Sequence, residues 1–175
     1  MSDAGSAESG LMSEASQANP ASHPVAVIME RIALANRWVS EKWEAKGIVD
    51  DVEPVGTAER VIVRTEQITQ ILFPGHAIRL HRDEAEGYHM NITSPQPKVF
   101  VMWRMRDGIA RPEMLTVSYN EGARWMDSDE HVDGVALPLQ LLPWIGQFAE
   151  LHYKPEPRKP KRYASSKDKG RMGGV

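Results

Sequence analysis

The 175-residue sequence contains no cysteine. Disulfide bonds, thiolate metal sites and iron–sulfur ligation by this chain are therefore excluded. No apolar run approaches the roughly 20 residues that a membrane-spanning helix needs. The first 23 residues carry no positive charge and no long apolar run, which argues against a secretory signal. These absences lead us to expect a soluble, cytoplasmic protein.

Both ends of the chain are poor in residues that suit a hydrophobic core. Residues 1–23 are mainly Ser, Ala, Gly, Glu and Gln, and we expect a disordered arm with a charge of −3. Residues 154–175 carry eight Lys or Arg against two acids, which predicts a disordered tail of about +6. Since the net charge is −3, residues 24–153 carry about −6. This middle is long enough to fold as one domain.

Apolar runs predict strands over most of the middle. Residues 25–29 (VAVIM) and 98–105 (KVFVMWRM) are apolar at both parities, as in strands that are covered on two faces. Shorter runs at 59–65, 67–73 and 114–119 predict further strands. The order of these runs favours consecutive antiparallel strands.

Residues 37–49 (RWVSEKWEAKGIV) fit a helical spacing as well as a strand, and the aromatic and β-branched residues favour the strand. Trp38 and Trp43 have opposite parity, so both are buried only if the strand is covered on two faces. One of them is therefore expected to be exposed. With Arg37 beside it, an exposed tryptophan is typical of an anchor for a protein partner.

The stretch 77–93 (AIRLHRDEAEGYHMNIT) alternates in two halves and follows a turn predicted at residues 73–75. We predict an antiparallel hairpin with residues 83–87 as its loop. This register pairs apolar residues on one face and sets His81 directly opposite His89 on the other.

The histidine pair is the candidate metal site. Opposed residues have Cβ atoms about 5 Å apart, so both imidazoles reach one divalent ion, with Asp83 or Glu84 as a carboxylate ligand. Imidazole plus carboxylate suits zinc, iron or nickel. The alternative is a solvated strand face with ordinary hydrogen bonds. No nucleophile with an evident base and no glycine-rich phosphate loop is present, so no catalytic residue is assigned.

Helices are predicted near the end of the domain. Ser118, with Glu121 three residues later, forms a capping-box pattern. Residues 128–134 are predicted to be an acidic loop, and Pro138 opens a helix that continues to about Tyr153. About six or seven strands followed by helices predict an α+β fold: a mainly antiparallel sheet or small open barrel, with a short helix and a C-terminal capping helix.

Four strings resemble one uncharacterised proteobacterial family of domains of unknown function: PVAVIMER (24–31), NRWVSEKW (36–43), LHRDEAEGY (80–88) and SYNEGAR (118–124). The resemblance covers residues 24–162. Members of that family are encoded near molybdenum- or tungsten-dependent formate dehydrogenases, and some are labelled molybdopterin-guanine dinucleotide biosynthesis protein. The resemblance implies a role in formate dehydrogenase maturation or assembly, with a formate dehydrogenase subunit or maturation factor as partner. It supplies no catalytic residues.

Three hypotheses follow for the function. The first is a non-enzymatic accessory protein that binds a protein partner through Arg37, Trp38 or Trp43, and it requires no cofactor. The second is a small metal- or cofactor-binding protein that uses His81 and His89. The third is nucleic-acid binding through the basic tail, where only Tyr163 is available for base stacking. The tail is otherwise explained as a solubilising end.

Overall fold

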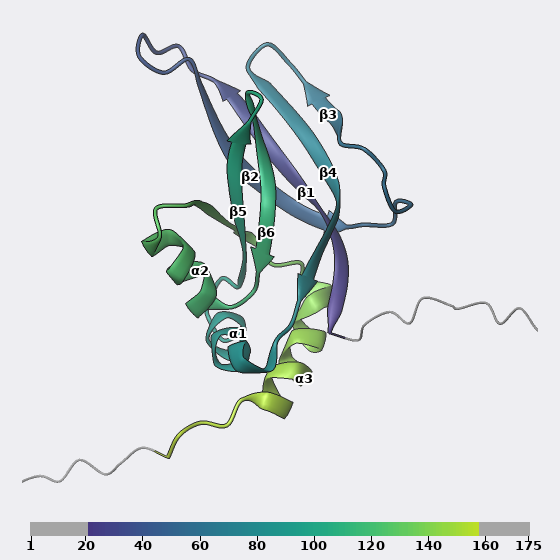
Figure 1. The fold of residues 1–175 in the computed structure, drawn as a ribbon, viewed down its shortest axis with the longest axis vertical. Coiled ribbons are helices and arrows are strands. Elements are labelled where there is room, and N and C mark those ends of the chain that lie inside the picture. The colour runs from purple at the N-terminus through teal and green to yellow at the C-terminus, as the bar shows by residue number, and fades with distance from the viewer. Residues whose placement is uncertain (1–20, 158–175) are drawn as a thin grey trace, which may run out of the picture.

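The computed structural model describes residues 21–157, and within them two antiparallel sheets pack face to face around one core (Figure 1). The predicted α+β class is therefore confirmed, with two separate sheets in place of a small open barrel. The predicted arm and tail lie outside the described residues for 1–20 and 158–175. Ser22 and His23, which were assigned to the arm, are already paired in the first strand.

The larger sheet has the strand order β2–β1–β4–β3. Its strands are β1 (Ser22–Ala33), β2 (Glu41–Asp50), β3 (Arg60–Arg64) and β4 (Ile68–Arg79). β1 is an inner strand, as the apolar run VAVIM predicted, and Val25, Val27 and Met29 are fully buried. The ambiguous stretch 37–49 becomes a strand from Glu41 onward, which agrees with the strand interpretation.

The smaller sheet has the order β6–β5–β7 and consists of β5 (Lys98–Arg106), β6 (Ile109–Thr116) and β7 (His131–Ala136). β7 corrects the prediction of an acidic loop at 128–134. Asp133 is not a solvated loop residue, because its carboxylate accepts hydrogen bonds from the Trp103 indole at 2.7 Å and from the Ala45 backbone at 2.8 Å. Ala45 belongs to β2, so this carboxylate joins the two sheets.

Three helices gather at one end of the two sheets (Figure 1). They are α1 (Ala85–Ile92), α2 (Tyr119–Asp127) and α3 (Leu142–His152). The predicted cap of α2 is present, since Ser118 Oγ accepts a hydrogen bond from the Glu121 backbone at 3.1 Å. α3 follows the short 3-10 turn Leu139–Leu141 after Pro138. No helix within residues 21–157 has the length and apolarity to cross a membrane.

The predicted hairpin over residues 77–93 is wrong. β4 continues through the predicted turn to Arg79, with an irregular register against β1 and with Gly75 at φ +84°. The second half of the predicted hairpin is helix α1, where Ala85, Tyr88 and Asn91 are buried at every third position. Helical spacing, not alternation, therefore determines which side chains of this segment face the core.

Candidate functional site

The connection between β1 and β2, residues 34–40, carries Trp38, the most exposed aromatic ring among Phe, Tyr and Trp of residues 21–157 at 86%. The connection is closed by a backbone hydrogen bond from Leu34 to Ser40 at 2.9 Å, and the Asn36 side chain accepts from the Trp38 backbone at 2.9 Å. The Arg37 guanidinium lies 5.8 Å from the Trp38 ring centroid, within cation–π range. The turn thus presents an arginine–tryptophan pair to solvent.

Trp43 lies on β2 and is held differently. It packs against the hydrophobic core, and its indole nitrogen donates to Glu41 at 3.1 Å. The same carboxylate accepts a hydrogen bond from Arg31 at 3.1 Å. The expectation that only one of the two tryptophans is exposed is met, although Trp38 lies in the connection and not on the strand. Partner binding by either residue stays a prediction.

A groove of about 430 Å³ opens beside Trp43, where the larger sheet extends past the β5–β6 turn. Trp43, Arg31, Thr69 and Arg64 are paired side by side across all four strands and line its floor. Gly108, in a turn whose two central residues have positive φ, lines it together with the next residue of β6. The groove therefore depends on the smaller sheet ending at this turn.

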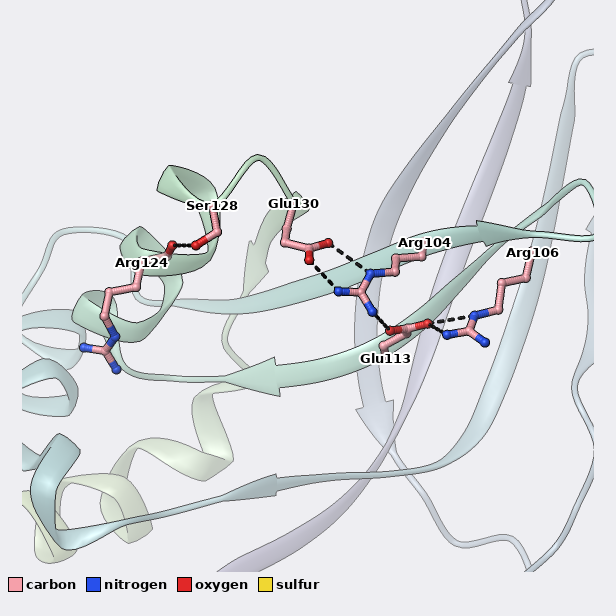
Figure 2. A network of polar contacts seen from close by, with 6 residues as sticks. All are labelled: Arg104, Arg106, Glu113, Arg124, Ser128 and Glu130. Atoms are coloured by element: carbon pink, nitrogen blue, oxygen red, sulfur yellow. Dashed lines mark hydrogen bonds and ion pairs between the residues drawn. The ribbon is translucent and has the colours of Figure 1, made fainter.

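A cluster of ion pairs occupies the exposed end of β5 and β6. Figure 2 shows Arg104 between Glu130 and Glu113, with Arg106 also donating to Glu113. The hydrogen bond from Arg104 lowers the pKa of Glu130. The charges of two arginines and two glutamates cancel in this cluster. The Arg104 guanidinium is therefore already paired and is less available to a binding partner. Arg37, in contrast, makes no ion pair with any of the described residues, and its charge is available to a partner.

The three residues of the predicted metal site do not come together as expected. His81 lies two residues after the end of β4 and lines a polar cleft, whereas His89 lies on α1 and stacks on Tyr153 with ring centroids 5.0 Å apart. Asp83 is exposed in the 3-10 turn Arg82–Glu84. The cross-strand register does not exist, because residues 85–92 are helical. Among residues 21–157, no group of three His, Asp or Glu side chains is arranged to hold a metal ion.

The polar cleft brings together residues that the sequence interpretation kept apart. It measures about 390 Å³ and is lined by His76 and Arg79 of β4, by His81 two residues beyond that strand, and by Glu113 and Glu121 from β6 and α2. The predicted turn at residues 73–75 concealed this arrangement, because it placed His76 outside the strand. β4 in fact continues through Pro74, which lies opposite a bulge in the pairing with β1. The sequence gives no sign of this continuity, because a proline followed by a glycine is typical of a turn.

His76 is expected to make folding stability depend on pH. Burial lowers the pKa of the His76 imidazole, and the nearby Asp51 carboxylate opposes this shift. The unfolded chain therefore binds more protons below the ordinary histidine pKa of about 6.5, and stability falls as the pH drops through that value. Urea unfolding at about pH 7.5 and about pH 5.5 should show a larger loss for the wild type than for His76→Gln. Equal losses would contradict this assignment.

The hydroxyl group of Ser118 makes hydrogen bonds that hold two helices together. It is fully buried, and its hydroxyl donates to Glu84 at 2.5 Å while accepting from the Glu121 backbone at 3.1 Å. The other Glu84 oxygen pairs with Arg124 of α2. These contacts join two of the strings quoted above, LHRDEAEGY and SYNEGAR, and tie the start of α1 to α2.

Fold and sites together define an α+β protein of two antiparallel sheets with an exposed arginine–tryptophan tip. The chain matches the model of the family "Protein of unknown function (DUF3305)" over residues 24–162, and it belongs to that family. Comparison with curated proteins and with solved structures gives no match.

Proposed function

We propose that this protein is a non-enzymatic accessory protein that binds a protein partner through the β1–β2 connection. The observation that carries the proposal is Trp38, with 86% of its surface in water on an ordered turn. Exposing so large an apolar ring contributes nothing to the fold, because burial of apolar surface is what stabilises it. Tryptophan and arginine are also the side chains that most often dominate the binding energy of protein interfaces.

The surroundings of Trp38 support an interface. Leu34 and Val39, from the same connection, are 37% and 50% exposed and extend the apolar surface around the ring. Arg37 adds a positive charge that no described residue neutralises. The groove beside Trp43 is lined in part by β2, the strand that follows the β1–β2 connection. A partner that binds Trp38 therefore has a concave surface close by.

Formate dehydrogenase is the context in which we place this binding. The support is the resemblance of four strings in this sequence to a family encoded near molybdenum- or tungsten-dependent formate dehydrogenases. We therefore propose a formate dehydrogenase subunit or one of its maturation factors as the partner, during maturation or assembly of that enzyme.

Co-purification from the native host under mild conditions tests this proposal. The wild-type protein should recover a formate dehydrogenase subunit or maturation factor, identified by mass spectrometry. Trp38→Ala should reduce that recovery at least about tenfold, as expected for a central interface residue. Leu139→Ala is the matched control, because Leu139 is also largely exposed, at 76%, but precedes α3. Recovery of the protein alone, without any such partner, would overturn the proposal.

A further inference from the structure

β3 is an open edge of the larger sheet. It pairs only with β4, and all five of its residues are exposed. Val61, Ile62 and Val63 are 42%, 42% and 38% exposed, so three β-branched apolar side chains in succession meet solvent. The backbone groups that point away from β4 have no strand partner among the described residues. Such an edge is a template for one more strand.

The side chains of β3 are distributed over both faces of the sheet. Val61 and Arg64 line the groove described above, next to their β4 partners Ile71 and Thr69. Val63 pairs with Gln70, which has the opposite parity on β4 and therefore faces the other side. An added strand would continue both faces and place alternate side chains against Val61 and Val63.

Charge selects between the possible occupants of this edge. Arg60 pairs with Glu53 at 2.7 Å, whereas Arg64 makes no ion pair with any described residue. If a second copy paired antiparallel about Ile62, Arg64 of each copy would lie opposite Arg60 of the other. The only carboxylate partner of Arg60 among the described residues, Glu53, is already engaged, so Arg64 would gain no acidic partner. Like charges directly opposite each other destabilise a sheet. A strand with apolar residues and an acidic end is the complementary occupant.

We propose that β3 binds an extended, acid-ended apolar segment of the partner protein as a fifth strand of the larger sheet. The inference rests on the proposed partner binding, and it names the chemistry of the segment that is bound. Main-chain hydrogen bonds provide affinity in this mode of recognition, and the side-chain contacts and end charges provide selectivity. The register shift between Val61 and Val63 limits regular pairing to a short strand.

A pair of synthetic peptides tests the inference on the full chain. The probe is a heptapeptide of alternating valine and threonine with glutamate at both ends, and the matched control has lysine at both ends. In an NMR titration, the glutamate-ended peptide should shift the amide signals of residues 60–64 and bind at least about fivefold more tightly than the control. Arg64→Glu should reverse this preference. Arg64 is exposed, so an unchanged thermal unfolding midpoint of the variant serves as the folding control.

The outcomes separate the two proposals. Equal binding of both peptides would overturn the preference for an acid-ended segment, and shifts confined to residues other than 60–64 would overturn strand addition at this edge. Recovery of a partner that depends on Trp38 but not on Arg64 would leave the proposed function standing without the added strand. Selective peptide binding to β3 without any recovered partner would support strand addition and overturn the proposed accessory role.

Discussion

Gly87→Ala is expected to destabilise the protein by about 3 kcal/mol. A Cβ atom at Gly87 on α1 would overlap Ser118 Oγ and would lie 3.1 Å from Ser118 Cβ and 3.3 Å from the Asn120 backbone nitrogen. Ser118 is fully buried and holds both Glu84 and the cap of α2, so it cannot turn away without losing these contacts. Overpacking costs about 1–3 kcal/mol, and a lost cap costs about 1 kcal/mol.

The matched control for this substitution is Gly146→Ala on α3. A Cβ atom there would meet only Ile92 Cδ1, at the ordinary contact distance of 3.8 Å. Alanine favours helix over glycine by about 1 kcal/mol, so the control should be neutral or slightly stabilising. Urea unfolding of the two variants measures the difference. A loss smaller than about 1 kcal/mol for Gly87→Ala would show that α1 and α2 can separate at little cost.

Asn91→Ala is expected to cost a similar amount, about 3 kcal/mol, for a different reason. Asn91 is 2% exposed, and its amide donates to the backbone oxygens of Lys98 and Val117 at 2.7 and 2.8 Å. Its side-chain oxygen accepts from the Lys98 backbone at 3.0 Å. Alanine leaves these groups without partners, and each buried unpaired group costs about 1–3 kcal/mol.

Asn91→Asp distinguishes lost hydrogen bonds from lost packing. The aspartate keeps the shape and the acceptor for the Lys98 backbone, but it directs a carboxylate at two carbonyl oxygens. Near neutral pH it should therefore destabilise at least as much as alanine, and the difference should shrink in acid as the carboxyl group gains a proton that it can donate. Denaturant unfolding at two pH values measures this. Wild-type stability of Asn91→Asp would contradict the assigned role.

The central strands and the capped helix were predictable because their signals are local. β1 and β5 are apolar at both parities, which is typical of strands covered on two faces, and both are inner strands. The capping-box pattern correctly placed the start of α2, where Ser118 Oγ accepts from the Glu121 backbone, although the Ser118 backbone N–H donates to Thr116 Oγ1 and not to the Glu121 side chain. In each case the pattern that predicts the element lies in residues that are close together in the sequence.

Helix α1 escaped prediction because two of its key residues contradict helical patterning. Gly87 is unfavourable inside a helix, and it is present because Ser118 leaves no room for a side chain. Asn91 is polar yet buried, so the core-facing spacing of Ala85, Tyr88 and Asn91 does not look apolar. Tyr88, whose hydroxyl accepts from the His81 backbone at 2.8 Å, also fits a strand alternation. The missing information lay in tertiary contacts.

The candidate sites, too, were predictable only where the evidence for them is local in the sequence. The sequence predicted from strand parity that one of Trp38 and Trp43 is exposed, but Trp38 is exposed because it lies in the β1–β2 connection. The groove beside Trp43 depends on how far the larger sheet extends past the β5–β6 turn. The cleft that joins His76 and His81 depends on β4 continuing through Pro74. Neither the relative length of two sheets nor a continuous strand through a proline is visible in a local pattern.

The affinity of the purified partner for wild type and for Trp38→Ala is the most direct measurement of the central claim. With the partner identified by co-purification, isothermal titration calorimetry gives both dissociation constants. Loss of a central tryptophan typically costs about 2 kcal/mol or more, so Trp38→Ala should bind at least about 30-fold more weakly, while Leu139→Ala should bind as the wild type does. Dissociation constants for Trp38→Ala and wild type that agree within about twofold would contradict binding through the β1–β2 connection.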